Sequence, residues 1–344
     1  MDELLALGYF RSGKNMFYCP VTFLDGEANT TIRTRLNLSN HKFSKSVRKL
    51  LRQNNQKFSY EFVEYSPELA VEELYQIYKS ECFKGDLSGE LDDWLTGSEN
   101  KEIFESKICK IYDGDHLVAA SFIDVGQDSI ASIMGIYHPA YKKYSLGVYS
   151  MLLEVEYAKV EGKSFYYAGY ILSNSSRFEY KKKVGPLEFI RINAKDWIPL
   201  EEIEEKDYIV EHTLDKLEDL QEYLWSFMIE SEVYAYPLYS WNSYPLDADL
   251  LEQYFFLRIE IPGMETMFIA VTFDALEGVY QITLANSLGA SSPTWIEFLN
   301  YYSDEGNWLD TILIRQRGRK LEDMNLLPLM ILNILEKLKS TQPG

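Results

Sequence analysis

The segment from Ser145 to Lys181 has the residue types and spacing most suited to chemistry in this chain. The turn Ser145-Leu146-Gly147 precedes apolar residues at helical spacing, so its backbone N–H groups are expected at a helix N-terminus, where anions bind. A short aromatic strand then ends at Tyr167-Ala168-Gly169-Tyr170, and a polar segment leads to Tyr180 and Lys181. The segment therefore combines a predicted anion site with Tyr and Lys side chains.

A ladder of short strands precedes this segment and must position it. Alternating and β-branched residues, with Asp- and Gly-rich turns between them, predict three antiparallel strands at Ile108–Tyr112, Leu117–Val125 and Ile130–Tyr137. An amphipathic helix is expected from about Leu146 to Glu161, followed by a strand over Ser164–Tyr170. This β–β–β–α–β order is typical of a GNAT-like acyltransferase sheet and is also compatible with other α+β domains.

A strongly basic segment lies earlier in the chain, because residues 28–60 contain no Asp or Glu. Lys45, Arg48, Lys49 and Arg52 are spaced to share one face of a helix. Two interpretations stay open. The face is either a solvated helix surface or a contact for the phosphate backbone of RNA, with salt-sensitive and largely sequence-independent affinity.

The net charge of −19 is unevenly distributed. Residues 1–200 hold 25 Lys and Arg against 27 Asp and Glu, whereas residues 201–344 hold 9 against 26. This shift predicts two domains. We expect a basic part over residues 1–65 and a GNAT-like core over residues 66–200, which together form the first domain, and an acidic α+β domain of unknown role over residues 201–344. The predicted fold class is thus α+β, a mixed sheet with flanking helices plus a second acidic domain.

Several classes of protein are disfavoured by composition. Cys19, Cys82 and Cys109 are far apart and form no CxxC pair, so neither a disulfide framework nor a zinc site is predicted. The four histidines show no ligand spacing, and we expect no metal and no cofactor. No apolar run approaches the ~20 residues of a membrane span, and the N-terminus does not look like a signal peptide. We therefore expect a cytoplasmic protein without a membrane partner.

The first half resembles the aminoacyl-tRNA–protein transferases, the arginyl- and leucyl-transferases that modify protein N-termini. The resemblance runs from about Leu4 to Leu187, and its order and spacing are more specific than any single element. It rests on Gly8–Gly13, Arg35, the segment Ser44–Asn54, Leu117–Ala120 with Asp124-Val125, Pro139 with Ser145-Leu146-Gly147, and the run Tyr167, Gly169, Tyr170, Ser175, Tyr180 and Lys181.

The chain departs from the family pattern at several positions. Family members usually begin with a segment that carries paired cysteines, and a second cysteine cluster would fall near residues 19–29. Here Cys19 is the one cysteine of that region. Phe10 replaces a family arginine, and Ser176-Arg177 stands where the family has Arg-Lys. These differences bear on donor and acceptor specificity.

The resemblance implies that the free α-amine of an acceptor protein attacks the ester of an aminoacyl-tRNA, with Arg or Leu as the donor amino acid. Under this interpretation Tyr180 is the proton shuttle or leaving-group acid and Asp124 an orienting carboxylate, while backbone N–H groups of strand 130–137 stabilise the oxyanion. The expected substrate contacts are Arg11, Ser145, Gly147, Tyr167, Tyr170, Arg177 and Lys181, of which Arg177 and Lys181 would hold an acidic acceptor side chain. The expected tRNA contacts are Arg35, Lys45, Arg48, Lys49 and Arg52. Protein arginylation in an N-degron setting would follow if the donor is Arg.

Other interpretations remain open at the level of sequence. The chain could be a diverged binding module without transferase activity, or an ordinary GNAT enzyme that binds acyl-CoA at the Ser145–Gly147 turn. Tyr180 could be a core residue, Asp124 a turn cap, and Lys181–Lys183 a solvated run. A homodimer is possible through aromatic residues that look exposed in the acidic half, namely Tyr234, Tyr236, Tyr239, Trp241 and Tyr244.

Overall fold

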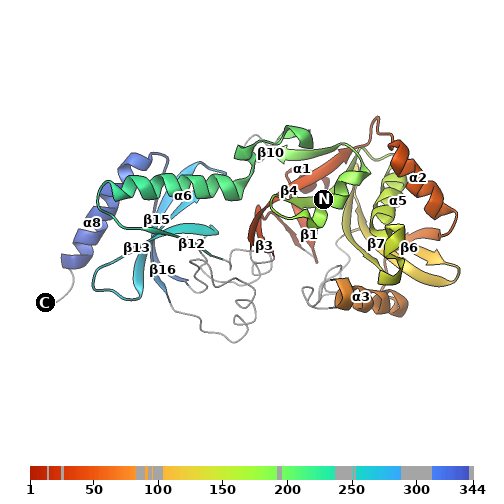
Figure 1. Ribbon diagram of the computed structural model, residues 1–344, viewed down its shortest axis with the longest axis horizontal. Helices are drawn as coiled ribbons and strands as arrows, with labels where there is room; N and C mark the ends of the chain where they lie inside the picture. Colours follow the sequence, from red (N-terminus) through yellow and green to blue (C-terminus); the bar gives the residue numbers. More distant parts are fainter. Residues whose placement is uncertain are drawn as a thin grey trace. The chain divides into compact units, whose positions relative to one another are not determined.

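The computed structural model describes residues 1–13, 15–24, 27–82, 90, 91, 95, 104–191, 196–236, 251, 253–287 and 312–340 (Figure 1). The chain divides into two compact units. Unit 1 comprises Met1–Tyr18 and Ile32–Ile203, and unit 2 comprises Cys19–Thr31 and Glu204–Gly344. The segment Cys19–Thr31 thus belongs to unit 2 although it lies within the first part of the sequence.

Unit 1 is built on a long mixed sheet. Its strands follow the order β11 (Asp196–Pro199), β10 (Leu187–Arg191), β4 (Glu27–Asn37), β9 (Phe165–Leu172), β8 (Ser129–Tyr137), β7 (His116–Val125), β6 (Ser106–Asp113) and β5 (Ser59–Glu64). Strands β5 to β8 pair antiparallel in sequence order, and β9 pairs parallel to β8. A short hairpin, β1 (Phe10–Ser12) and β2 (Asn15–Phe17), forms separately. The predicted β–β–β–α–β order and the α+β class are confirmed.

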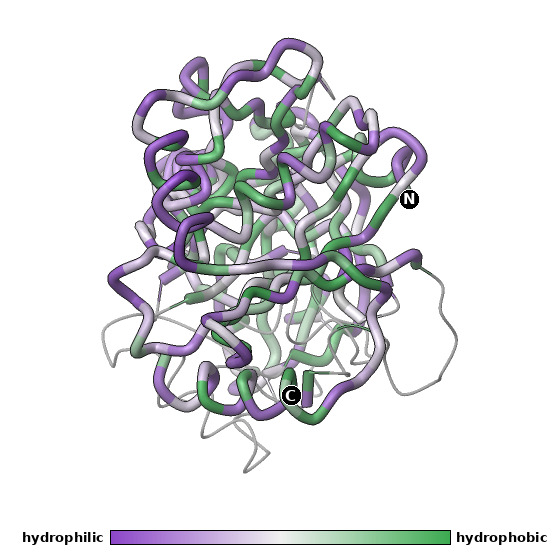
Figure 2. Tube along the Cα trace, turned by 90° about the vertical axis from the view of Figure 1, so that its right-hand side faces the viewer, coloured by the Kyte–Doolittle hydropathy of each residue, from purple (hydrophilic) through white to green (hydrophobic). Residues whose placement is uncertain are grey.

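Successive side chains of a strand point to opposite faces, so this sheet has two apolar faces, and helices cover both of them. Helix α5 (Leu146–Val160) packs on the face that includes Cys109, Ile111 and Ala119. Helix α3 (Leu69–Cys82) packs on the opposite face, against Ile108 and Ala120. The shorter elements of unit 1 are α1 (Asp2–Ala6), α2 (Lys45–Asn55), η1 (Pro139–Tyr144), η2 (Ser176–Val184) and η3 (Leu200–Glu202). In Figure 2 the hydrophobic stretches of the tube lie mainly along inner strands, and the hydrophilic ones along outer turns and helices.

Helix α5 is more deeply buried than its sequence pattern indicates. The expected amphipathic helix with one apolar face is wrong, because ten of its residues are buried, including Ser150 and Glu154. The sheet covers one side, and α2 and η2 pack on others. Gly162 follows the helix with a φ of 68°, a conformation that glycine adopts without steric cost, and this confirms the predicted end of the helix.

Unit 2 contains an antiparallel sheet of five strands, β12 (Glu232–Ala235), β13 (Phe255–Glu260), β14 (Met267–Asp274), β15 (Val279–Ser287) and β16 (Ile312–Leu321). It also contains α6 (Ile209–Trp225), α8 (Leu327–Ser340), η4 (Glu205–Asp207), η5 (Met324–Leu326) and β3 (Val21–Leu24), which pairs with the start of β4. The first turn of α6 is tied to that strand by the Val210 N–H, which donates to Thr30 Oγ1 at 3.0 Å. This half is therefore α+β, as predicted.

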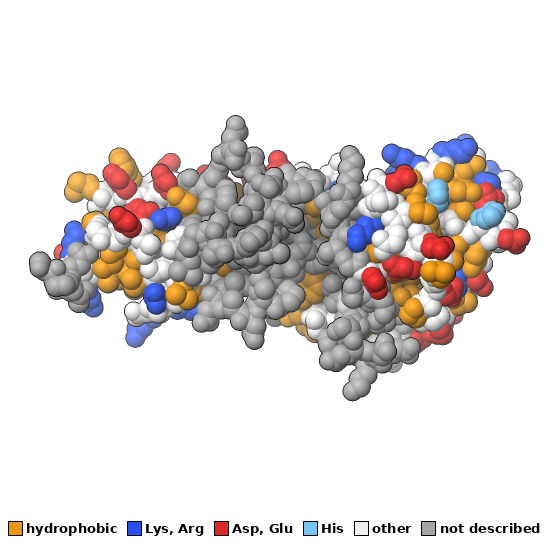
Figure 3. Space-filling model, turned by 90° about the horizontal axis from the view of Figure 1, so that it is seen from below, with side chains coloured by type: hydrophobic (Ala, Val, Ile, Leu, Met, Phe, Trp, Pro, Cys, Tyr) orange, Lys and Arg blue, Asp and Glu red, His pale blue; other side chains and the backbone are white. Residues whose placement is uncertain are grey.

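The basic residues of unit 2 are concentrated on its edge strand. Strand β16 carries Arg315, Arg317, Arg319 and Lys320, and its pairing with β15 is interrupted by register shifts. Charged side chains and bulges both prevent an edge strand from pairing with other chains, so this cluster has a structural explanation. On the face shown in Figure 3, acidic and basic side chains of the described residues are interspersed with hydrophobic ones.

Some sequence expectations for unit 2 change with the structure. Tyr236 is fully buried in a cluster with Phe256 and Phe268, so its assignment to an exposed dimerisation surface is wrong. Tyr239, Trp241 and Tyr244 lie outside the described residues. Cys19, Cys82 and Cys109 are all free thiols. Within the described parts of the chain, every helix is too short or too polar to cross a membrane.

Candidate functional site

A small cavity of about 80 Å³ lies in unit 1, where β8 and β9 separate. These strands pair from Ser129–Phe165 to Ala131–Tyr167, and the register ends there although both strands continue through described residues. Ser132, the next residue of β8, and Gly169, two residues beyond Tyr167 on β9, line the cavity. Its full lining is Leu5, Gly8, Tyr9, Phe10, Arg11, Arg33, Thr34, Ala131, Ser132, Ile133, Tyr167, Gly169, Tyr170, Lys181 and Trp197. The pairing of β8 with β9 therefore ends beside the cavity.

The cavity wall is cationic. Arg11, Arg33 and Lys181 belong to its lining, and no Asp or Glu does among the described residues. Buried charges are costly unless they are paired or hydrogen-bonded, so the neighbours of these three cations determine what the cavity offers a ligand. Each of the three is held differently by its neighbours.

Lys181 projects from η2 into the cavity. Its Nζ atom donates to the backbone oxygen of Tyr170 at 2.9 Å and lies 5.2 Å from the centroid of the Tyr170 ring and 4.8 Å from that of Phe178. Burial of the ammonium group, together with the nearby Arg33 charge, lowers the pKa of Lys181 to about 7, and Glu154 opposes this shift. Lys181 is thus poised to change its charge near neutral pH.

Arg33 was missed by the sequence analysis. It lies on β4, is 5% exposed, and its Nε donates to the backbone oxygen of Gly8 at 3.0 Å. Its guanidinium stacks 3.7 Å from the ring centroid of Phe10 and 4.9 Å from that of Tyr170. Residues two apart share a face of a strand, so the predicted Arg35 was the signal that could have identified it.

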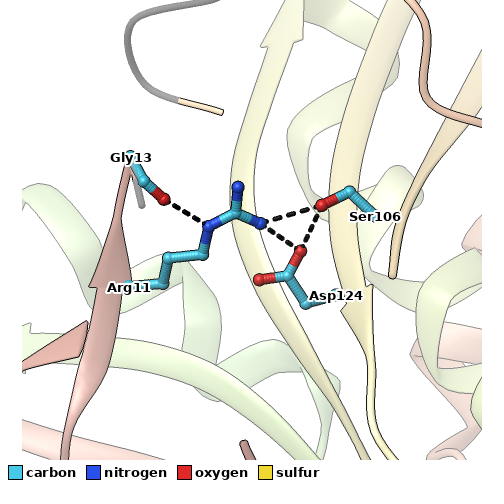
Figure 4. A network of polar contacts seen from close by, with 4 residues as sticks. All are labelled: Arg11, Gly13, Ser106 and Asp124. Atoms are coloured by element: carbon cyan, nitrogen blue, oxygen red, sulfur yellow. Dashed lines mark hydrogen bonds and ion pairs between the residues drawn. The ribbon is translucent and has the colours of Figure 1, made fainter. Parts of the chain in front are cut away.

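Arg11 is fixed by a buried ion pair with Asp124 (Figure 4). Its Nη1 also donates to Ser106 Oγ at 2.8 Å, and its Nε donates to the backbone oxygen of Gly13 at 2.6 Å. Ser106 Oγ in turn donates to the same oxygen of Asp124 at 2.6 Å. Burial raises the pKa of Asp124, while Arg11 and Ser106 act in the opposite direction. Asp124 itself is not part of the cavity lining, so it reaches the cavity only through Arg11.

Glu154 is a second functional candidate that the sequence did not reveal. It is fully buried on α5, and Tyr166 Oη donates to its Oε2 at 2.6 Å. Burial raises the pKa of Glu154 to about 7, opposed by the hydroxyls of Tyr166, Ser121 and Ser132 and by the charge of Lys181. The apolar residues expected in this helix recur every three or four positions, and Glu154 is not one of them. Periodicity alone therefore places its carboxyl group on the solvent side.

Tyr180 lies beside the cavity and not in its lining. The residue is 38% exposed. Burial of its hydroxyl, with smaller contributions from Glu154, Tyr137 and Tyr170, raises the pKa of Tyr180 to about 12. The hydroxyl therefore stays protonated at neutral pH and can donate a proton or a hydrogen bond. Arg177, on the first turn of η2, is half-buried and likewise outside the lining.

The remaining predicted substrate residues fall into two places. Tyr167 and Tyr170 are on β9 and line the cavity. Ser145 and Gly147 begin α5, as predicted. Ser145, and not Gly147, adopts the left-handed conformation, with a φ of 53°. The Val148 and Tyr149 N–H groups donate to the Ser145 backbone oxygen at 3.0 and 2.9 Å, and the Ser145 N–H donates to the Lys142 oxygen at 3.1 Å, so the N–H groups left over at the helix start are those of Leu146 and Gly147.

The basic helix is confirmed as α2, and it is joined to the start of α5. Lys45, Arg48, Lys49 and Arg52 are all exposed on it. Asn54 Nδ2 at its last turn donates to the backbone oxygen of Tyr144 at 3.0 Å, directly before the Ser145 turn. The basic surface and the helix N-terminus of α5 are thus fixed next to each other.

Arg35, the fifth predicted tRNA contact, is in a different environment. Its Nε donates to Glu188 Oε2 at 2.7 Å, and its side chain is 14% exposed. It also stacks 4.1 Å from the ring centroid of Phe165 and 4.4 Å from that of Trp197. Its charge is already matched by a carboxylate, so it has less to offer a phosphate than the residues of α2.

Comparison with known proteins gives a family match over part of the chain. Residues 42–191 match the family model described as arginine-tRNA-protein transferase, C terminus. The aspartate/glutamate leucyltransferase of Campylobacter jejuni is 24% identical over 196 residues, which are 55% of this chain and 79% of that protein. The protein of the same name from Leptospira interrogans is 27% identical over 173 residues, covering 47% and 65%.

Other matches are shorter or more remote. The aspartate/glutamate leucyltransferase of Acinetobacter baumannii is 30% identical over 86 residues. This chain therefore spans 32% of the length of that protein. Among solved structures, the C-terminal domain of a putative lysylphosphatidylglycerol synthetase from Agrobacterium fabrum matches with a TM-score of 0.34 and 10% identity, over 41% of this chain and 46% of that one.

The mixed sheet of unit 1, in which the pairing of β8 with β9 ends beside a cationic cavity, defines an α+β domain. Within that class, residues 42–191 match the aminoacyl-tRNA–protein transferase family, a family of aminoacyltransferases. The resemblance inferred from the motifs between Ser44 and Lys181 is thereby confirmed.

Proposed function

We propose that the protein transfers an amino acid from aminoacyl-tRNA to the N-terminus of an acceptor protein that begins with Asp or Glu. Support comes from the family match over residues 42–191 and from relatives named aspartate/glutamate leucyltransferase. The single observation that carries the acceptor preference is the cavity, whose wall contains Arg11, Arg33 and Lys181 and, among the described residues, no acid.

The acceptor's acidic side chain is assigned to this cavity. A volume of about 80 Å³ suits the few atoms of a short carboxylate side chain, and the arginine fork suits carboxylate geometry. Lys181 and Arg33 approach the same Tyr170 ring from their separate elements, so they converge on one position. Arg177, which the sequence also suggested for this task, would act nearer the surface.

Leucine is the favoured donor amino acid, with arginine as the alternative. Names of the relatives agree with this order. Transfer of Arg, and with it arginylation, would require a separate binding site for the donor side chain.

The aminoacyl-tRNA is assigned to α2 and the start of α5. The exposed Lys45, Arg48, Lys49 and Arg52 would contact the phosphate backbone, and the adjacent N–H groups of Leu146 and Gly147 would hold a phosphate near the 3′ end. The ester is already activated, so catalysis rests mainly on placing the acceptor amine against it.

The transfer forms a C–N bond and breaks the C–O bond to the ribose. The amine nitrogen supplies the electron pair, and the C–O pair leaves with the ribose oxygen, which takes up one proton. Tyr180, whose hydroxyl stays protonated, is proposed to donate that proton and to regain one from the attacking nitrogen, which loses a proton as it becomes the amide N–H. Backbone N–H groups of β8 beyond Ala131, where pairing with β9 ends, are proposed to stabilise the oxyanion.

The test uses labelled Leu-tRNA and Arg-tRNA with peptides that begin with Asp, Glu, Asn or Gln. We expect transfer of Leu to the acidic peptides only, and its loss in Arg33→Met. Lys182→Met provides a matched control, because Lys182 is exposed and paired with Glu179. Absence of transfer from either tRNA to any peptide would contradict the proposal. Salt-insensitive or absent tRNA binding in the same samples would then favour a diverged binding module.

An acyl-CoA-dependent reaction is the second candidate. The divergence of β8 and β9 and the helix start at Ser145 are the features that favour it. Calorimetric titration with CoA decides between the two. Binding of CoA that is lost when Gly147→Pro removes a backbone N–H from the first turn of α5, where Pro is tolerated, would support the second candidate, whereas absence of binding would exclude it.

A further inference from the structure

Strand β8 is irregular close to the point where its pairing with β9 ends. Ser132 and Met134 pair with consecutive residues of β7, so Ile133 is an extra residue between them. An extra residue of this kind is a β-bulge, which bends a strand and increases its local twist. The pairing with β9 ends at Ala131, two residues before the bulge. The bulge therefore gives a local reason for the separation of the two strands.

The carboxyl group of Glu154 connects the two strands from the side that α5 covers. Glu154 is fully buried, and Tyr166 Oη on β9 donates to its Oε2 at 2.6 Å. The hydroxyl of Ser132 on β8 forms a second hydrogen bond with the same carboxyl group. One side chain of α5 thus holds a hydroxyl group from each of the two strands.

These two hydroxyl groups lie on either side of the end of the pairing. Tyr166 is opposite Ile130, within the paired part, whereas Ser132 is the first residue of β8 beyond it. Ser132 also lines the cavity. In the described part of the chain the backbone pairing stops at Ala131 and Tyr167. Beyond that pair, Glu154 supplies a connection between the strands through side chains.

A carboxyl group is a costly choice for the interior of α5. Burial of such a group is unfavourable unless it is hydrogen-bonded, and an apolar residue of similar volume is often at least as stable. The neighbouring Leu153 and Val155 are apolar and buried in the same helix. The hydrogen bonds of Glu154 therefore have a role that packing does not supply.

We propose that Glu154 is a positioning residue, which holds Ser132 and Tyr166 and so fixes the width of the opening between β8 and β9. The inference rests on the function proposed above, because the opening presents the backbone N–H groups of β8 that were assigned there to the oxyanion. Such groups stabilise a developing charge only when they are held at hydrogen-bond distance from it. Glu154 is not part of the cavity lining, and no covalent bond changes at its carboxyl group.

Hydrogen exchange of the full chain, followed by mass spectrometry, measures this connection directly. Glu154→Leu fills similar space but forms no hydrogen bond, so the backbone N–H groups of β8 and β9 should exchange about tenfold faster. Glu154→Gln keeps an acceptor oxygen for Tyr166 and should exchange at close to the original rate. Glu156→Leu is the matched control, because Glu156 is a half-buried carboxyl group two residues further along the same helix.

Transfer kinetics test the consequence for the reaction. With labelled Leu-tRNA and a peptide that begins with Asp, kcat should fall about tenfold in Glu154→Leu and recover in Glu154→Gln. Both variants remove the negative charge that acts on Lys181. A change in the KM for the peptide that is common to both therefore reports this charge, whereas a difference in kcat between them reports the opening. The affinity for tRNA should stay unchanged in both.

Tyr166→Phe tests the same connection with Glu154 in place, and it replaces Glu154→Leu if that variant does not fold. It removes the 2.6 Å hydrogen bond from β9 and leaves the bond from Ser132. We expect the N–H groups of β9 to exchange about fivefold faster, a smaller effect because one of the two hydrogen bonds remains. Exchange at the original rate would refute the proposal.

The outcomes separate the inference from the proposed function. Unchanged exchange of β8 and β9 in Glu154→Leu would overturn the inference, whether or not the protein transfers amino acids. Faster exchange with an unchanged kcat would overturn the positioning role and leave the proposed function intact. Equal acceleration in Glu156→Leu would show a general loss of stability and also overturn it. Absence of transfer by the unmodified chain would overturn the proposed function, and the positioning role with it.

Discussion

Gly169 and Lys181 are matched to each other, because a Cβ atom at residue 169 would lie 3.0 Å from the Lys181 Nζ atom. The φ of Gly169 is 87°, so the strand also adopts a backbone conformation there that other residues rarely take. The absence of one side chain on β9 thus allows a cation from η2 to reach the cavity where β8 and β9 separate.

The first prediction concerns this pair. Gly169→Ala should weaken binding of an Asp-started peptide at least tenfold, because the new methyl group displaces the ammonium. Gly114→Ala is the matched control, since Gly114 has a φ of 63° and open space around it. Both changes should lower the free energy of unfolding by about 1–2 kcal/mol through backbone strain alone. Equal peptide affinity in the two variants would show that Gly169 is a purely conformational requirement.

The second prediction concerns the buried ion pair of Arg11 and Asp124. Asp124→Asn leaves the arginine charge buried without its partner, which costs about 3–5 kcal/mol of unfolding free energy. Urea titration at neutral pH measures the loss. For comparison, Glu179→Gln breaks an exposed pair with Lys182 and should cost less than about 1 kcal/mol. If Asp124→Asn were as mild as this control, Arg11 would not depend on Asp124 for its position.

The third prediction concerns pH and His41, whose ring is 8% exposed. Burial, with a smaller contribution from Lys159, lowers the pKa of His41 below its usual 6.5. The unfolded chain therefore binds more protons than the folded one below about pH 6.5, and the free energy of unfolding falls as the pH drops through that range. Above this range both states are neutral and the contribution is constant.

Substitution separates His41 from other titrating groups. Urea titrations between pH 5 and pH 8 should show a flatter profile for His41→Gln than for the unmodified chain. His116→Gln is the control, because His116 is exposed. A profile unchanged by His41→Gln would assign the acid sensitivity to other residues.

The fourth prediction concerns the basic surface of α2. Replacing Lys45, Arg48, Lys49 and Arg52 by Gln should lower tRNA affinity about tenfold or more and reduce the slope of log affinity against log salt by roughly three, since each phosphate contact contributes a little under one. Gel shifts at several salt concentrations measure both quantities. Lys206→Gln with Lys216→Gln removes charge from unit 2 instead. An equal loss in that control would reveal a general charge effect and no specific tRNA surface.

The order of elements around the cavity could be predicted from the sequence, because it depends on local patterns. The alternation and turn residues between Ile108 and Tyr137 determine three strands, and the Ser145 turn begins α5 where expected. The spacing of Lys45 to Arg52 determines the exposed face of α2. These features follow from the repeat of 2 residues in a strand and of 3.6 residues in a helix. Such repeats can be recognised in a sequence without knowledge of its tertiary contacts.

Only the tertiary structure decided which charges face the cavity. Arg33 and Arg35 lie on the same face of β4. Glu188 neutralises Arg35, whereas Arg33 lines the cavity with Lys181. Arg11 meets Asp124 across 113 residues of sequence. Glu154 is buried because α2, η2 and the sheet surround α5. Burial and ion pairing depend on such distant contacts, and they set the charge state of each group, so residue types alone could not reveal them.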